Sequence, residues 1–322
     1  MTYEEASDIY KRITGISVSP DSIESYTKKV GQKVHEMECE HARELMDHPE
    51  LAAQESEAGM QANGGDADDP IYLEIDGSHL NTREDGCEWK ENKLAVAFRQ
   101  SDIKHCGKEE DSRIQISRKD FVSTIGPVGE NLKKFTNLFY GLAVRMGALH
   151  AKEVIVLADG ASWIRNMVER LLPHAVIILD WYHATEHLWK CAKELYGENS
   201  PKAGEWVMRY KALLWEGKVK QVLELLLEEA AEAKKQTPLR DLYSYFNTRK
   251  EGMRYDEFRQ KGYHIGSGAI ESANKYVIQK RMKQAGMRWT FQGANSLAAL
   301  RIRYLKDCWD PLWKPGGVAW AA

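Results

Sequence analysis

Two short runs of apolar residues, each ending in an aspartate, lie near the middle of the chain. They are Val154-Ile-Val-Leu-Ala-Asp159 and Ala175-Val-Ile-Ile-Leu-Asp180. Runs of this length and β-branched content predict strands that are buried on both faces of a sheet. The segment between them, Ser162 to Leu172, has a helical pattern that Pro173 ends. Together these segments predict a parallel β-α-β unit with an aspartate at the carboxyl end of each strand, where α/β folds place functional groups.

Three further strands are predicted upstream of this unit. They are the apolar runs Ile71–Ile75, Leu94–Phe98 and Ile114–Val122, and a predicted helix over Glu130–Leu149 follows them. The predicted order is therefore β-β-β-α-β-α-β-α. This order is typical of a mixed α/β sheet (α+β type) with RNase H-like architecture, in which three antiparallel strands extend a parallel core.

The amino-terminal residues, 1–54, are predicted to be helical. Thr2 and Glu5 have the spacing of a capping box, and Ser19 followed by Pro20 predicts the start of a second helix. Two helices joined by a glycine-containing turn describe either a helix-turn-helix or a plain helical hairpin. Residues 55–70 are acidic and contain few apolar side chains, so they predict a flexible linker and a domain boundary.

The rest of the chain is also predicted to be mostly helical. Residues 201–262 contain helical patterns without a strand signal between them, at Ala203–Trp215, Val219–Lys235 and Leu239–Glu251. We therefore predict an α/β core whose first part spans residues 71–200. An all-α insertion follows at 201–262, and carboxyl-terminal helices at 263–322 complete the core.

Charge is unevenly distributed along the 322 residues, although the net charge is only −3. Residues 271–306 contain eight Lys or Arg and one acidic residue, whereas residues 43–69 contain one Arg and eight acidic residues. This asymmetry predicts one basic element that faces a polyanion and one solvated acidic segment.

The cysteines and the hydropathy of the sequence indicate where in the cell the protein is expected to act. The cysteines are odd in number and none are spaced as C-x-x-C, which argues against a disulfide framework and a zinc ribbon. The sequence has no signal-peptide pattern and no apolar run near the roughly 18 residues that a membrane span needs. We therefore expect a cytoplasmic protein without a membrane partner.

Three carboxylates are candidates for chemistry. Asp76 and Asp159 each follow a predicted strand and precede a glycine, and Glu271 follows a Gly-Ser-Gly turn at the start of a predicted long helix. If the fold brings them together, their mutual repulsion requires a cation, and Mg²⁺ suits an all-oxygen site. Two such ions about 4 Å apart can drive phosphodiester displacement. Glu74, on the same strand face as Asp76, is either a support for the metals or a surface residue.

The predicted helix after Glu271 carries the candidates for DNA contact. Its basic residues can neutralise phosphates without reading base sequence, or they can form a solvated face. Most of the tryptophans are expected to lie in the core. Trp289, which lies beside these basic residues in the sequence, is instead a candidate for contact with DNA. The DNA-binding candidates are Lys275, Arg281, Lys283, Arg288 and Trp289.

Five motifs carry a family resemblance. They are A-D-G-A-S-W-I at 158–164, L-D-W-Y-H-A-T-E-H at 179–187, M-R-Y-D at 253–256, I-G-S-G-A-I-E-S at 265–272 and G-M-R-W at 286–289. In combination they resemble the insertion-sequence transposases of the Kra type, which are bacterial relatives of the Mutator-like DDE transposases. The resemblance covers roughly residues 2–312.

This resemblance implies an RNase H-like core that an all-α insertion interrupts before the final glutamate. It implies that Asp76, Asp159 and Glu271 are the catalytic triad and hold two Mg²⁺ or Mn²⁺ ions. It also implies that Asp180 and His183 form a supporting D-x-x-H motif near the active site. The implied activity is metal-dependent cleavage and strand transfer of DNA, acting on element ends and target DNA as a homo-oligomer.

Two alternatives remain open at this stage. Members of the resembling family usually carry a longer amino-terminal region with cysteine pairs, which this sequence does not match. The chain is therefore either an active core or a truncated, catalytically incompetent DNA-binding remnant. Separately, His183-x-x-Glu186-His187 matches the inverted zincin pattern and makes a zinc metallopeptidase a less favoured alternative, because the match is short.

Overall fold

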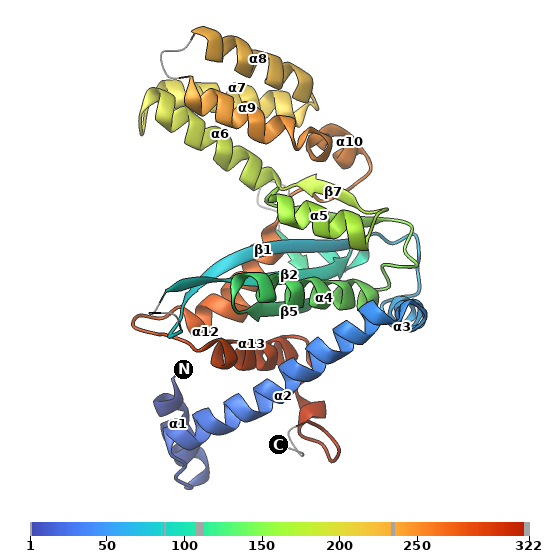
Figure 1. The fold of residues 1–322 in the computed structure, drawn as a ribbon, viewed down its shortest axis with the longest axis vertical. Helices are drawn as coiled ribbons and strands as arrows, with labels where there is room; N and C mark the ends of the chain where they lie inside the picture. The colour runs from blue at the N-terminus through green and yellow to red at the C-terminus, as the bar shows by residue number, and fades with distance from the viewer. Residues whose placement is uncertain (1, 85, 87, 107–112, 233–235, 319–322) are drawn as a thin grey trace. The chain divides into compact units, whose positions relative to one another are not determined.

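The computed structural model describes residues 2–84, 86, 88–106, 113–232 and 236–318 of the chain. It divides into two units, whose parts can be followed by colour in Figure 1. Unit 1 comprises Met1–Val154 and Ala269–Ala322, and unit 2 comprises Ile155–Gly268. Unit 1 is therefore assembled from both ends of the chain, and unit 2 is inserted between them.

A three-stranded antiparallel arrangement lies at the centre of unit 1. Its strands are β1 (Ile71–Asn81), β2 (Trp89–Arg99) and β5 (Asp120–Ile125), with β2 in the middle. The apolar run Leu94–Phe98 is completely buried, as a middle strand covered on both faces requires. Two short strands, β3 (Ile103–Cys106) and β4 (Arg113–Ile116), form a separate antiparallel pair.

Two of the strand predictions were wrong in their boundaries. The run predicted as one strand over Ile114–Val122 is split between β4 and β5, because the buried Asp102 holds the bend between them. Its carboxylate accepts hydrogen bonds from Ser117 Oγ at 3.1 Å and from Arg118 Nε at 2.9 Å. Strand β1 also continues well beyond its apolar part, since its polar residues pair with β2 as far as Asn81. Asp76 therefore lies within a strand, opposite Leu94, and not at a strand end.

Helices pack around these strands in unit 1. Helix α4 (Val128–Met146) contacts β2 and β5, α13 (Phe291–Leu305) contacts β5, and the long helix α2 (Pro20–Asp47) contacts both α4 and α13. Helix α1 (Tyr3–Thr14) packs on α2. The predicted helix starts are confirmed: Thr2 and Glu5 form a capping box, and Ser19 caps α2. Unit 1 also contains the 3₁₀ turns η1 (Gln100–Asp102) and η5 (Asp310–Leu312).

The first half of the segment predicted as a flexible linker is helical. Helix α3 (Pro49–Ala62) covers the first half of residues 55–70 and packs against α4. Its small residues serve close packing: Ser56 is fully buried and its Oγ accepts the Leu149 N–H at 3.0 Å. At Gly59 a Cβ atom would lie only 2.3 Å from the Arg145 carbonyl oxygen. A composition that resembles a linker therefore reflects two helices in close approach.

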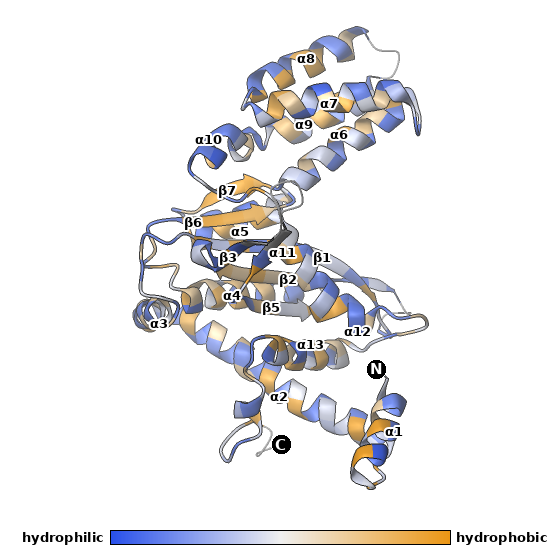
Figure 2. Cartoon of the chain, turned by 180° about the vertical axis from the view of Figure 1, so that it is seen from behind, coloured by the Kyte–Doolittle hydropathy of each residue, from blue (hydrophilic) through white to orange (hydrophobic). Residues whose placement is uncertain are grey.

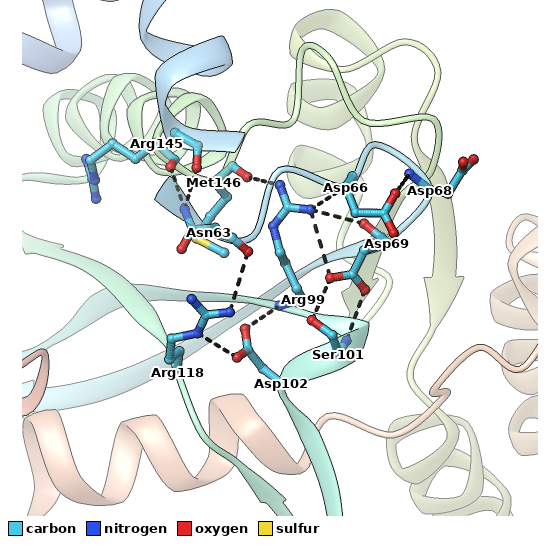
Figure 3. A network of polar contacts seen from close by, with 11 residues as sticks. Asn63, Asp66, Asp68, Asp69, Arg99, Ser101, Asp102, Arg118, Arg145 and Met146 are labelled. Atoms are coloured by element: carbon cyan, nitrogen blue, oxygen red, sulfur yellow. Dashed lines mark hydrogen bonds and ion pairs between the residues drawn. The ribbon is translucent and has the colours of Figure 1, made fainter. Parts of the chain in front are cut away.

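A fully buried arginine fixes the second half of this segment (Figure 3). The Arg99 guanidinium donates hydrogen bonds to the backbone oxygens of Asp66 at 2.9 Å, Asp69 at 3.4 Å and Met146 at 2.9 Å. Its Nη1 also lies 4.0 Å from a carboxylate oxygen of Asp69. Burial lowers the pKa of Arg99, and a buried cation persists only when its donors find partners. Residues 63–69 are thereby tied to the end of β2.

The predicted parallel β-α-β unit is present. Strands β6 (Val154–Ala158) and β7 (Val176–Leu179) pair in parallel, with Ala158 opposite Leu179, and α5 (Ser162–Leu171) connects them. Both strands are strongly hydrophobic (Figure 2). With antiparallel strands in unit 1, this parallel pair and many helices, the chain has a mixed α/β fold.

Unit 2 continues as helices after β7. Helix α6 (Trp181–Tyr196) packs on α7 and α9. No strand occurs in the described residues of 201–262, as the sequence predicted, and residues 233–235 of the predicted second helix lie outside the description. The elements of this region are α7 (Pro201–Trp215), α8 (Val219–Glu232), α9 (Thr237–Asn247), η3 (Lys250–Met253) and α10 (Tyr255–Gln260).

The long basic helix predicted after the Gly-Ser-Gly turn is a composite. It consists of α11 (Gly268–Ala273), a π-helical turn η4 (Asn274–Gln279) and α12 (Lys280–Met282). A π-helical turn adds a residue to the turn and shifts the side chains that follow it, so the basic residues do not share one regular helical face. Among the helices in the described part of the chain, none is long and apolar enough to cross a membrane.

The contact between α3 and α4 generates a stability prediction. We expect Gly59→Ala to lower the free energy of unfolding by about 1–3 kcal/mol, because its Cβ collides with the Arg145 carbonyl. Gly204→Ala in α7 is the matched control, since a Cβ there meets no atom within 4 Å. The control should be neutral or up to about 1 kcal/mol more stable. Urea denaturation followed by circular dichroism measures both variants, and equal effects would contradict the close approach.

Candidate functional site

Asp76 is held in place by the residue that begins the π-helical turn. Its Oδ2 accepts a hydrogen bond from Asn274 Nδ2 at 2.7 Å, and its Oδ1 accepts the Gly77 N–H at 2.7 Å. Asn274 is buried, and its Oδ1 accepts no hydrogen bond from the described residues. Both carboxylate oxygens of the half-buried Asp76 are thus oriented by neighbours, one local and one distant in sequence.

A second carboxylate on β1 holds the start of α11. Glu74 is completely buried and its Oε2 accepts the Ile270 N–H at 2.8 Å. The first N–H groups of a helix have no partners within the helix, and an anion there is favourable. Of the two alternatives for Glu74, the surface position is therefore wrong: this carboxylate anchors the helix that carries Glu271.

Glu271 lies directly after Ile270 and is exposed. Asn274 follows it by three residues, a spacing that places two side chains on neighbouring positions of a helical surface. Unit 1 therefore brings two of the predicted triad residues, Asp76 and Glu271, onto contacting elements through Glu74–Ile270 and Asp76–Asn274.

Asp159, the third member of the predicted triad, belongs to unit 2 and follows β6 in a tight turn. Its Oδ1 accepts the Ala161 N–H at 2.8 Å, and Gly160 adopts a φ of 83°, which favours glycine. Tyr245 Oη donates to the Asp159 carbonyl oxygen at 2.6 Å, and Arg249 Nε donates to the Gly160 carbonyl oxygen at 2.7 Å.

Tyr245 and Arg249 were missed by the sequence reasoning. Both belong to the helical insertion, and the Arg249 guanidinium lies over the Tyr245 ring with its carbon 4.0 Å from the ring centre. Burial raises the pKa of Tyr245, so its hydroxyl stays a hydrogen-bond donor. No local sequence signal marks them, because their partners are backbone oxygens of a distant turn.

The predicted Asp180–His183 pair forms directly. Asp180 is completely buried and caps α6: its Oδ2 accepts hydrogen bonds from the His183 N–H and from His183 Nδ1, both at 2.9 Å. Its Oδ1 accepts the Ser267 N–H at 2.7 Å, within the Gly-Ser-Gly turn. The hydrogen bond to Asp180 raises the pKa of His183 to about 9, and the charge of Asp159 adds to the shift. His183 is therefore an imidazolium ion at neutral pH.

The H-x-x-E-H motif lies on the first turns of α6, and the ring of its first histidine is already engaged. Asp180 accepts the Nδ1–H of His183, which leaves Nε2 as the nitrogen that a metal could reach, an arrangement that zinc-binding histidines also show. The ring of His187 stacks on Tyr245 with the ring centres 3.8 Å apart. Among the side chains that the structure describes, no three His, Cys, Asp or Glu form a group able to hold a metal ion. All residues of this motif lie within unit 2, whereas the predicted triad is divided between the units.

The DNA-binding candidates have different surroundings. Lys275, Lys283 and Arg288 are exposed, and Arg281 is half-buried. Trp289, in contrast, is only 8% exposed, and its Nε1 donates to the Met282 carbonyl oxygen at 2.9 Å. The interpretation of Trp289 as a DNA contact is therefore corrected: its ring is packed into unit 1, and its backbone bonds to β1 at Asn81.

A family model described as an uncharacterised protein family, UPF0236, matches residues 18–309, which is most of the chain. No curated protein matches the sequence.

The raised pKa of His183 predicts that stability depends on pH. Because the folded-state pKa of about 9 exceeds the ordinary value of 6.5, the stabilisation is complete below pH 6.5 and is lost as the pH rises through 9. We expect the wild-type protein to lose roughly 1–3 kcal/mol of unfolding free energy over this window, allowing for partial exposure of the ring.

His183→Asn provides the comparison, since its amide can still donate to Asp180 but does not titrate. Between pH 6.5 and 9 its unfolding free energy should therefore fall by about 1–3 kcal/mol less than that of wild type. His174→Asn, an exposed control, should follow the wild-type curve. Thermal or urea unfolding at several pH values measures this, and identical curves for wild type and His183→Asn would refute the assignment.

Proposed function

The chain belongs to the uncharacterised protein family UPF0236, and we propose that it acts as the catalytic core of a DDE transposase. In this proposal the resemblance to Kra-type insertion-sequence transposases extends to function: metal-dependent cleavage and strand transfer of DNA. The observation that carries it is the hydrogen bond between Asp76 and Asn274. This bond joins β1 to the helical segment of Glu271, although the two acids are far apart in the sequence.

The chemistry of the three carboxylates suits Mg²⁺ or Mn²⁺. Asp76, Asp159 and Glu271 offer only oxygen donors, which these ions prefer. We propose that they hold two ions, which when bound would activate a water or a 3′-hydroxyl and stabilise the leaving oxygen of the phosphodiester. Asn274 and the Gly77 N–H orient Asp76, and the Ala161 N–H orients Asp159, as outer partners of metal ligands generally do.

Asp180 and His183 act in this proposal as positioning residues. Asp180 fixes Ser267, which lies four residues before Glu271, and so sets the direction in which the chain enters α11. The imidazolium of His183 supplies positive charge that interacts with Asp159. Tyr245 and Arg249 hold the backbone of the Asp159 turn from the helical insertion. The insertion would thereby support the site as well as separate two parts of the sequence.

The exposed basic residues would hold DNA at this site. Lys275, Lys283 and Arg288 can bind phosphates, and Arg281 contributes from a half-buried position. We propose that the partners are element ends and target DNA, that the protein acts in the cytoplasm, and that it works as a homo-oligomer. We also propose that the strands and helices described above build an RNase H-like core, which their order along the chain supports.

Cleavage of DNA by acidic-residue variants tests the enzyme proposal. Purified full-length protein is incubated with labelled duplexes from both flanks of its gene, in Mg²⁺, Mn²⁺ or EDTA. We expect the wild-type protein to nick DNA with either metal. Asp159→Asn should lower the nicking rate by more than about 100-fold, because loss of a residue that only supports a metal ligand costs up to about that much. Asparagine keeps the acceptor for the Ala161 N–H, so the turn should survive. Asp76→Asn should lose a similar share of the nicking rate. It should also stay folded, because the Asn274 amide can flip and still form a hydrogen bond with the new side chain.

Glu224→Gln is the matched control, an exposed acidic residue of α8 in unit 2. It should nick DNA at the wild-type rate. The DNA-binding remnant is the competing function, and it predicts retention of the same duplexes without nicking in any metal. Wild-type protein that never nicks, or Asp159→Asn that nicks as fast as wild type, would refute the enzyme proposal.

A further inference from the structure

A groove in unit 1 lies between the helices of the two chain ends and contains none of the carboxylates discussed above. It consists of two cavities of about 570 and 330 Å³. They adjoin, because Thr27, Leu297, Arg301 and Tyr304 line both. The walls come from α1 and α2 on one side and from η4, α12 and α13 on the other. The volumes are within the range of ligand-binding pockets, about 300–1,000 Å³.

The described residues that line this groove carry positive charge and include no acidic residue. Lys280, Arg281 and Arg301 line the larger cavity, and none of the described residues that line either cavity is Asp or Glu. Arg301 Nε donates to the backbone oxygens of Tyr276 at 3.0 Å and Val277 at 2.9 Å, which fixes its charge beside the π-helical turn. A cleft lined by one sign of charge concentrates its field and attracts the opposite charge.

Aromatic side chains are interleaved with these cations. The Arg281 guanidinium carbon lies 5.0 Å from the ring centre of Tyr3, and Lys280 Nζ lies 5.6 Å from that of Tyr276. Tyr304, which lines both cavities, is 65% exposed. In the smaller cavity, Tyr26 stacks with Trp313. Large aromatic rings are usually buried, so rings that are exposed together in a groove indicate a binding surface. Their flat faces are open to a ligand.

Charge and aromatic faces together select one class of ligand. A cationic groove that tracks a backbone, with rings on which successive bases stack, is the arrangement that binds single-stranded nucleic acid. A duplex would use only the charges, because its bases are already stacked on each other. Two carboxylates close in sequence to lining residues are engaged elsewhere: Glu5 in the cap of α1, and Glu24 with Lys28 at 2.5 Å.

We propose that this groove binds an unpaired strand of DNA, with Lys280, Arg281 and Arg301 facing phosphates and Tyr276 and Tyr304 facing bases. The inference rests on the proposed function for its choice of DNA, since strand cleavage and transfer expose unpaired ends. It assigns a role to the amino-terminal helices α1 and α2, which form one wall. Their contribution would be the capture of a strand and not the reading of a duplex groove by a helix-turn-helix.

Oligonucleotide binding without metal tests the inference separately from catalysis. Fluorescence anisotropy of a labelled single strand of about 12 nucleotides, within the usual site size, is measured in EDTA with full-length protein. The duplex of the same sequence is measured beside it. We expect the single strand to bind more tightly. Tyr304→Ser should weaken this binding about fivefold or more, the loss of one stacked base. Lys280→Gln should reduce the slope of log K against log salt by about 0.7.

Two substitutions outside the groove serve as controls. Tyr196→Ser removes an exposed ring of α6, and Lys133→Gln removes an exposed charge of α4; both should bind the single strand as wild type does. Circular dichroism confirms that each variant is folded. Groove variants that bind the single strand like wild type, or a Tyr304→Ser loss that is equal for duplex and single strand, would overturn the inference.

The outcome is independent of the nicking assay. If wild-type protein nicks DNA and the groove variants bind the single strand normally, the groove inference fails and the enzyme proposal stands. If wild-type protein never nicks and the groove variants still lose the single strand, the enzyme proposal fails and the groove inference stands.

Discussion

Burying a charge without partners costs a large amount of free energy, and this constraint governs the segment that leads from unit 2 into unit 1. Asp180 is completely buried and satisfied by three donors, one of which is the Ser267 N–H. Glu74 is completely buried in unit 1 and accepts the Ile270 N–H. The short stretch before Glu271 is thus held at two points by two carboxylates. If the backbone at Ser267 or Ile270 moved away, a buried carboxylate would lose a hydrogen-bond donor at a large cost in free energy. The position of Glu271 therefore depends on Asp180 and Glu74.

The same principle explains which parts of the structure were predictable. Strands β2, β6 and β7 were predicted because their apolar side chains satisfy burial by themselves. The Asp180–His183 pair was predictable because both partners lie within one turn of sequence. Glu74 was not, since a glutamate in a strand normally faces water and its partner, the Ile270 N–H, is distant in sequence. Sequence alone contains no sign that this N–H would be available.

Other errors arise where one composition serves two structures. Small and polar residues are typical of linkers, and they also allow α3 to approach α4 closely. A basic run with one periodicity predicts one helix, but a π-helical turn interrupts it, beginning at Asn274, which donates a hydrogen bond to the distant Asp76. Trp289 was predicted to contact DNA because basic residues surround it in the sequence. Its ring is instead buried, and its indole N–H donates a hydrogen bond to a backbone oxygen inside unit 1. Each case required knowledge of what lies opposite in space.

The discontinuity of unit 1 has a consequence for synthesis on the ribosome. Helix α13 packs on α2 and β5, yet the 114 residues of Ile155–Gly268 are made between them. At about 5–20 residues per second, the apolar surface of the first part waits several seconds or more for its cover. During that interval a nascent chain exposes an incomplete core and depends on chaperones or on rapid folding of unit 2. A chain terminated before residue 291 would retain Asp76, Asp159 and Glu271 but not α13, which packs on α2 and β5 of unit 1, and should aggregate.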